Sequence, residues 1–77
     1  MARVRFFAQA KDATGCRSAD IEGATVAEVL EAAVSKFPDL SRVLEVSAVW
    51  LNGDPASPDE KVAPSDEVAV LPPVSGG

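Results

Sequence analysis

Residues 25–38 read TVAEVLEAAVSKFP, the only long helical pattern in the sequence. The apolar positions recur at helical spacing, which is typical of an amphipathic helix with one buried stripe. Thr25 and Glu28 match a capping box, in which the threonine accepts from a free N–H group of the first turn and the glutamate reaches back to it. Because Pro38 disfavours helical backbone at the preceding residue, we expect the helix to end at Phe37. The single apolar stripe predicts a sheet that packs against it.

A strand is expected near the start of the chain, over residues 3–8, RVRFFA. Its side chains alternate, so that Val4, Phe6 and Ala8 point toward the core. Phe7 is then an aromatic ring on the opposite, polar face. This strand is the first of two that precede the helix.

Residues 9–15 are polar or small, and we interpret them as the loop of a hairpin. Residues 16–22 have a weak apolar pattern, which favours an edge strand. Cys16 lies at the start of that strand. A role for its thiol as a sulfur donor is one hypothesis, but a small structural side chain is the favoured interpretation.

Further strands are expected after the helix. Residues 39–45 predict a short helical turn, and residues 47–51 predict a strand that leaves Trp50 on the face away from the helix. The following Asn52–Gly53 pair is the strongest short signal for a type I′ hairpin turn. Residues 67–71 form the last predicted strand.

The predicted elements follow the order strand, strand, helix, strand, short strand, strand. This order indicates an α+β fold of the β-grasp (ubiquitin-like) type, a mixed sheet of four to five strands packed on one main helix. A right-handed crossover through the helix places the last strand beside the first, at the sheet centre. We expect residues 1–71 to form this domain and residues 72–77, PPVSGG, to form a flexible C-terminal tail.

The composition excludes several classes of function. One cysteine and no histidine, in 77 residues, leave no internal disulfide and no histidine-based catalysis, and we expect no metal site. The net charge of −5 argues against nucleic-acid binding and fits a partner with a basic docking surface. No apolar run approaches the ~20 residues of a membrane span, so we expect a cytoplasmic protein.

The tail combines stiffness with a thin end. Each proline fixes φ and removes an N–H donor, and a glycine has no side chain to obstruct a narrow channel. The tail is therefore expected to divide into residues that set the exit direction, residues that give reach and residues that enter a partner's active site. These are, in chain order, Pro72 and Pro73, Val74 and Ser75, and Gly76 and Gly77.

The sequence resembles the MoaD/ThiS family of sulfur carriers. The resemblance runs from Phe6-Phe7-Ala8-Gln9, through the strand into Asn52, to the stretch 66–77. It is most similar to the small-subunit branch of molybdopterin synthase. The resemblance implies that the chain is no enzyme on its own, but the carrier subunit of a sulfurtransferase complex. It implies that the Gly77 carboxylate is adenylated, becomes a thiocarboxylate and donates sulfur to cyclic pyranopterin monophosphate, forming the molybdopterin dithiolene.

The resemblance also implies two partners, an E1-like (MoeB-type) adenylating enzyme that uses ATP and the large (MoaE-type) subunit of molybdopterin synthase. No cofactor is expected on the chain itself. An exposed apolar patch usually marks a partner surface. The predicted docking residues are Phe7 and Leu71, then Trp50, with Pro55 as an extension. Loops folded over this face, or a stray exposed Trp50, are the alternatives.

Two other functions stay open from the sequence. One is a ThiS-like carrier for another product, such as thiazole, cysteine or a thiolated tRNA base. The other is a ubiquitin-like protein modifier or binding module, because such modifiers also end in Gly-Gly. The sequence distinguishes the carriers only through the tail motif, and their partners define the difference.

Overall fold

The computed structural model describes residues 1–72. Within that part, five strands and three helices follow one another. In chain order they are β1 (Ala2–Phe6), α1 (Gln9–Thr14), β2 (Ser18–Ile21), α2 (Val26–Lys36), α3 (Leu40–Leu44), β3 (Ala48–Leu51), β4 (Asp54–Pro55) and β5 (Glu67–Leu71). The predictions for five residues lie outside the described part: Pro73, Val74, Ser75, Gly76 and Gly77.

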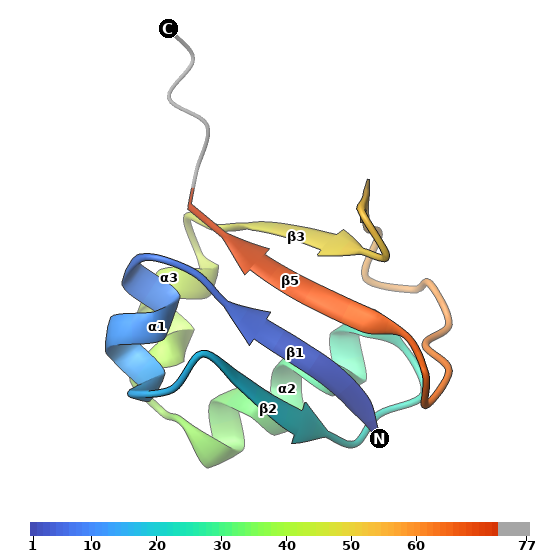
Figure 1. Ribbon diagram of the computed structural model, residues 1–77, viewed down its shortest axis with the longest axis horizontal. Coiled ribbons are helices and arrows are strands. Elements are labelled where there is room, and N and C mark those ends of the chain that lie inside the picture. Colours follow the sequence, from blue (N-terminus) through green and yellow to red (C-terminus); the bar gives the residue numbers. More distant parts are fainter. Residues whose placement is uncertain (73–77) are drawn as a thin grey trace, which may run out of the picture.

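The strands form one mixed sheet in the order β2-β1-β5-β3-β4, with α2 behind it (Figure 1). β1 and β5 are parallel, and the other neighbouring pairs are antiparallel. The predicted position of the last strand beside the first is therefore confirmed. Since β5 has a partner on each edge, the chain leaves the sheet at Leu71 from its central strand.

The main helix begins and ends where the sequence predicts. The Thr25 hydroxyl accepts from the Glu28 N–H at 3.2 Å. The Glu28 carboxylate accepts from the Ala24 N–H at 3.0 Å, one residue earlier than the capping box predicts. α2 ends at Lys36, and Phe37 takes a non-helical φ of −130° before the proline. The N–H groups of Val26 and Ala27 donate to the Glu60 and Pro58 carbonyls, each at 2.9 Å, so the first turn of the helix is satisfied.

The inner face of the sheet makes the core with α2. Val4, Val68 and Val70 are 0% exposed, and Phe6 is 2% exposed. The Phe6 ring packs edge-on against Phe37 at 5.7 Å between ring centroids. Helix α2 contributes Val26, Val29 and Ala33 to this core, and α3 contributes Leu40. Burial of this kind is the main favourable term for so small a chain.

The prediction of a loop over residues 9–15 is wrong, because α1 occupies most of that stretch. The predicted core position of Ala8 is also wrong, since β1 ends at Phe6 and Ala8 is exposed. Ala8 has φ 51° and ψ −119°, so the backbone bends sharply there. α1 buries one side chain, Ala10, and a single apolar residue in a six-residue helix gives no periodic signal.

The end of the sheet opposite the chain exit is held by a polar clamp. Asn52 and Gly53 both have positive φ, 50° and 86°, which confirms the predicted hairpin turn. The Asn52 amide donates to Asp66 at 3.1 Å, and its oxygen accepts from the Glu67 N–H at 2.9 Å. Asp66 also accepts from the Ala63 N–H at 2.8 Å. These donors, that of Ala63 first, lower the pKa of Asp66.

Candidate functional site

The outer face of the sheet, away from α2, carries two of the predicted docking residues in one row. Trp50 of β3 lies opposite Ala69 of β5 on one side and Pro55 of β4 on the other. Because Val49 and Leu51 pack against the core, Trp50 points to the outer face. Trp50 is partly buried and Pro55 is exposed. The predicted orientation of Trp50 is confirmed, while its role in docking stays a prediction.

A second row crosses the outer face where β5 ends. The Phe7 N–H donates to the Val70 carbonyl at 3.2 Å, and this hydrogen bond holds Phe7 beside the end of β5. Leu71 lies opposite Ala48 of β3 and is partly buried, and Pro72 after it is exposed. The Phe7 side chain is 38% exposed, which is unusual for a phenylalanine. Its predicted place on the face away from the core is confirmed.

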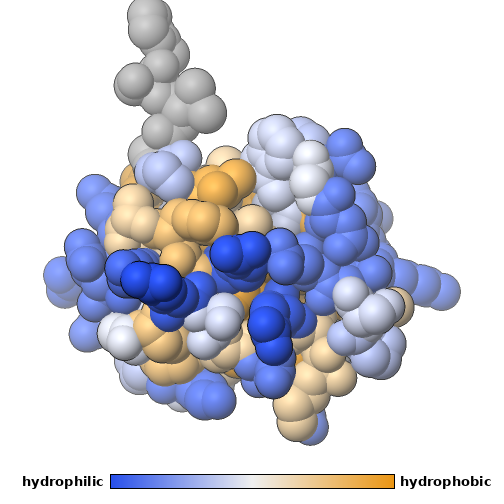
Figure 2. All heavy atoms as spheres, in the orientation of Figure 1, coloured by the Kyte–Doolittle hydropathy of each residue, from blue (hydrophilic) through white to orange (hydrophobic). Residues whose placement is uncertain are grey.

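These two rows form what we call the outer apolar patch. Hydrophobic residues gather on this face around the end of β5, with hydrophilic side chains beside them (Figure 2). The patch consists of Phe7, Ala48, Trp50, Ala69 and Leu71. An apolar surface next to the point where the chain leaves the domain is suited to a partner that also receives the following residues.

The other half of the outer face is charged. Arg3 lies 3.6 Å from Asp20, and Arg5 lies 3.7 Å from Glu67, measured between the closest nitrogen and oxygen. Each arginine therefore pairs with an acidic residue of a neighbouring strand, Asp20 of β2 or Glu67 of β5. All four side chains are about half exposed, so each pair contributes little, ~0–1 kcal/mol, to stability. Their place in the sheet limits the apolar patch to the end near Leu71.

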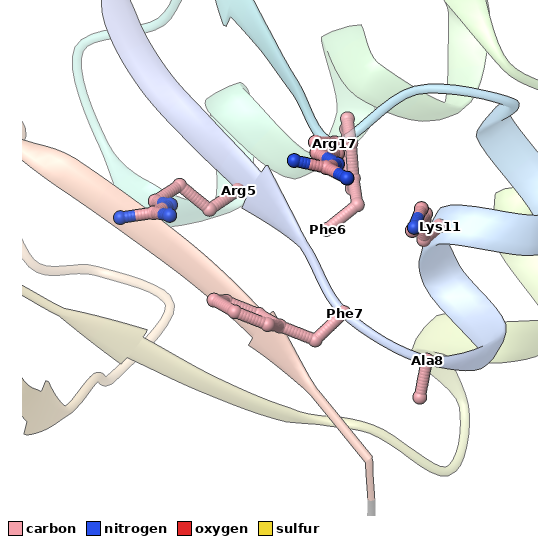
Figure 3. Close-up of a pocket in the computed structure, with 6 residues that line it drawn as sticks. All are labelled: Arg5, Phe6, Phe7, Ala8, Lys11 and Arg17. Carbon is pink, nitrogen blue, oxygen red and sulfur yellow. The ribbon is translucent and has the colours of Figure 1, made fainter.

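A hollow of about 310 Å³ adjoins the patch at Phe7 (Figure 3). Arg5 of β1, Lys11 of α1 and Arg17 bring three cations to it. The Arg5 guanidinium carbon stands 5.6 Å from the centre of the Phe7 ring, a cation–π contact. Apolar residues complete the lining: Phe6, Phe7 and Ala8. Sequence reasoning missed this hollow because it depends on α1, and a six-residue helix that buries only Ala10 leaves no periodic signal in the sequence.

Cys16 is a free thiol outside this site. It precedes β2 rather than lying within a strand, and its side chain packs against the hydrophobic core. Its backbone N–H and carbonyl both contact the Thr14 hydroxyl, at 3.4 Å and 3.1 Å. These contacts agree with a structural role.

Neither a metal-binding cluster nor a membrane-spanning helix is present in the part of the chain that the structure describes. Among residues 1–72, no cluster of three His, Cys, Asp or Glu side chains is arranged to hold a metal ion. None of the helices in that range has the length and apolar character needed to cross a membrane.

A mixed sheet wrapped on one main helix, with the chain leaving from its central strand beside an apolar patch, defines the ubiquitin-like β-grasp class. The predicted fold is therefore confirmed. The chain belongs to the ThiS family, whose model matches residues 4–77. The family resemblance seen in the sequence is confirmed by this match.

Named proteins that are similar to this chain include a sulfur carrier subunit, a modifier protein and a subunit of a converting factor. The molybdopterin synthase sulfur carrier subunit of Arabidopsis thaliana is 33% identical, over 97% of this chain and 81% of its own. The crystal structure of small archaeal modifier protein 1 from Haloferax volcanii is 37% identical and superposes with a TM-score of 0.81, covering 99% of this chain and 98% of that one. A complex of subunits 1 and 2 of the molybdopterin-converting factor from Helicobacter pylori contains a chain that is 27% identical, with a TM-score of 0.73 and coverage of 99% and 97%.

Proposed function

We propose that this protein is the sulfur carrier subunit of molybdopterin synthase and that its reactive group is the carboxylate of Gly77. The observation that carries the proposal is the family match, which runs through residue 77. The Arabidopsis relative, named a molybdopterin synthase sulfur carrier subunit, supports the same product. The chain is a co-substrate in this proposal, and the sulfurtransferase is the complex it joins.

The proposed chemistry begins with activation, because a carboxylate is a poor electrophile. A carboxylate oxygen of Gly77 attacks the α-phosphorus of ATP on an E1-like (MoeB-type) enzyme, and pyrophosphate leaves. The outer sulfur of a persulfide donor then attacks the acyl carbon, AMP leaves with the electron pair of the broken C–O bond, and an acyl disulfide forms. A second thiol attacks the inner, donor sulfur, so the S–S bond breaks, the two donor thiols are oxidised to a disulfide, and the outer sulfur stays on the carrier with the bonding electron pair. The product is a C-terminal thiocarboxylate. No cofactor resides on this chain, because ATP belongs to the partner enzyme.

In the second stage, the large (MoaE-type) subunit receives the thiocarboxylate. The thiocarboxylate sulfur forms a C–S bond to cyclic pyranopterin monophosphate, and water then cleaves the bond between that sulfur and the acyl carbon, which returns Gly77 as a carboxylate. One dithiolene takes the sulfur of two carriers. Both the acyl-adenylate and the thiocarboxylate hydrolyse readily, so a site that excludes water protects them. The chain contains no histidine, which agrees with partners that supply the acid and base groups. We place the reaction in the cytoplasm.

The outer apolar patch fits a role in docking. Phe7 and Leu71 lie beside the point where the chain leaves β5, so a partner seated on them also meets the residues that follow. Trp50 lies in the neighbouring row of the same patch, and Pro55, opposite Trp50, extends the surface beyond it. In this proposal Pro72 and Pro73 direct the exit, Val74 and Ser75 give reach, and Gly76 and Gly77 enter the partner's active site.

A protein modifier is the second candidate function. The likeness to small archaeal modifier protein 1, at 37% identity and nearly full coverage, favours it specifically. Both candidates begin with adenylation of Gly77 and differ in the nucleophile that follows, sulfur or a lysine amine. Carriers for other sulfur-containing products, such as thiazole, cysteine or thiolated tRNA, differ in the final acceptor.

Reconstitution separates these candidates. The chain is incubated with a MoeB-type enzyme, ATP, a sulfur donor, the large subunit and cyclic pyranopterin monophosphate, and the dithiolene product is measured. We expect product from this chain and none from a chain that lacks Gly77. A mixture that makes product with a control carrier but not with this chain contradicts the proposal. Transfer of the chain to lysine side chains of other proteins, with no dithiolene, favours the modifier.

A further inference from the structure

We infer that the hollow bordered by Arg5, Lys11 and Arg17 is a docking site for an acidic side chain of the large subunit, the partner that receives the tail. The hollow lies next to the outer apolar patch. This inference rests on the proposed function for the identity of the partner. It names the chemistry of the partner's contact, a carboxylate flanked by apolar groups.

The backbone holds the three cations around one space. The Phe6 N–H donates to the Arg17 carbonyl at 2.8 Å, which fixes Arg17 beside the end of β1. The bend at Ala8 starts α1 at once, since the Ala8 carbonyl accepts from the Asp12 N–H at 3.1 Å. Lys11 is therefore carried back toward the same strand end. In the view of Figure 3 the side chains of Lys11 and Arg17 lie on one side of the backbone at the end of β1, and those of Arg5 and Phe7 lie on the other.

The charge of the hollow is opposite to that of the whole chain. Three of the seven Lys and Arg residues line it, and the lining includes no Asp or Glu. Arg5 is paired with Glu67, at 3.7 Å. Within residues 1–72, Lys11 and Arg17 take part in no ion pair shorter than 4.0 Å. The net charge of −5 favoured a basic partner surface, whereas the local charge beside the patch favours an acidic contact.

The composition of the lining favours a protein carboxylate over a free phosphate. Half of the lining residues are apolar: Phe6, Phe7 and Ala8. An Asp or Glu side chain next to apolar neighbours matches such a surface, with hydrocarbon on the floor and oxygens toward the cations. Phe7 also belongs to the outer apolar patch, so one partner surface can cover both. Arg5 is engaged by Glu67 and the Phe7 ring, which leaves Lys11 and Arg17 as the main contacts.

The test measures the affinity of the full chain for the large subunit at low and high salt. The variant is Lys11→Glu with Arg17→Glu. The matched control is Lys36→Glu with Lys61→Glu, which makes the same change in net charge at exposed positions that do not line the hollow. We expect the variant to bind about tenfold more weakly at low salt and the control to change less than about twofold. The salt dependence of binding should also fall in the variant.

The outcomes separate this inference from the proposed function. If wild type binds and both double variants bind equally, the inference is overturned and the proposed function stands. If wild type does not bind the large subunit, both are overturned. Inorganic phosphate, titrated against the labelled chain, addresses the other ligand: saturable shifts at Lys11 and Arg17, together with unchanged binding of the partner, overturn the inference. Should the reversed variant fail to fold, Lys11→Gln with Arg17→Gln carries the test, with a loss of about threefold expected.

Discussion

The two faces of the central strands differ in what their side chains do. On the inner face Val4, Phe6 and Val68 are almost completely buried. On the outer face of the same sheet Phe7 remains 38% exposed, although it follows Phe6 directly in the chain. Alternation along a strand separates the two roles, because neighbouring residues point to opposite sides. The inner face therefore sets stability, and the outer face is free to be shaped for recognition.

The two adjacent phenylalanines give the largest test of this comparison. Phe6→Ala should reduce the free energy of unfolding by ~3–5 kcal/mol, because it empties a buried site that contacts Phe37. Phe7→Ala should change it by less than ~1 kcal/mol, since the ring is exposed. Urea denaturation of the two variants measures both values. Equal losses would mean that Phe7 belongs to the core and that the faces are not separate.

A glycine between β2 and α2 tests how tightly the inner side is packed. A Cβ on Gly23 would lie 2.6 Å from the Val29 backbone nitrogen and 2.9 Å from its Cα. Because backbone atoms cannot move aside cheaply, Gly23→Ala should cost ~1–3 kcal/mol in unfolding free energy. The control is Gly15→Ala, where an added Cβ meets nothing within 4 Å. Any loss of unfolding free energy at Gly15 therefore measures only the strain of a side chain at positive φ. A Gly23→Ala loss no larger than the control would contradict this packing.

The clamp at Asp66 predicts a smaller effect that depends on pH. Hydrogen bonds from Ala63 and Asn52 lower the folded-state pKa of Asp66. A lowered pKa adds stability that is present above the unfolded-state value of ~4 and is lost as the pH falls through the folded-state value. Asp66→Ala should therefore flatten the acid limb of the curve of unfolding free energy against pH. An unchanged limb would show that the clamp does not hold the start of β5.

The smallest expected effect is at the charged half of the outer face. Arg3 and Asp20 form an exposed pair, each with a side chain that is 60% exposed. Arg3→Ala should change the free energy of unfolding by ~0.5 kcal/mol or less. Thermal unfolding at low and high salt measures it. A loss as large as that of Phe6→Ala would mean that the outer face also determines stability.

The parts of the fold with strong local signals were predictable from the sequence. The capping box and Pro38 gave the limits of α2, and the Asn52–Gly53 pair gave the hairpin turn. The alternation of residues 67–71 gave β5, and the crossover rule gave its neighbour. Phe7 was predictable as an outer residue for the same reason, because its place follows from strict alternation.

The part near Ala8 was not predictable. The positive φ of Ala8 is unusual for an alanine, and no glycine, asparagine or aspartate stands at that position to indicate a bend. The short helix that follows buries only Ala10, so tertiary packing rather than a periodic pattern stabilises it. The hollow depends on both features, since they bring Lys11 to the side of Phe7. The net charge of the whole chain, −5, gives no indication that Arg5, Lys11 and Arg17 form a local cluster of cations.

The central claim is that the fold serves as a rigid base for a reactive carboxylate on Gly77. The most direct test is the intact mass of the chain after incubation with a MoeB-type adenylating enzyme, ATP and a sulfur donor, for wild type and for a chain without Gly77. We predict that wild type gains the mass difference between sulfur and oxygen, while the shortened chain gains none and keeps its melting temperature. An unchanged wild-type mass, under conditions that convert a control carrier, would contradict the account.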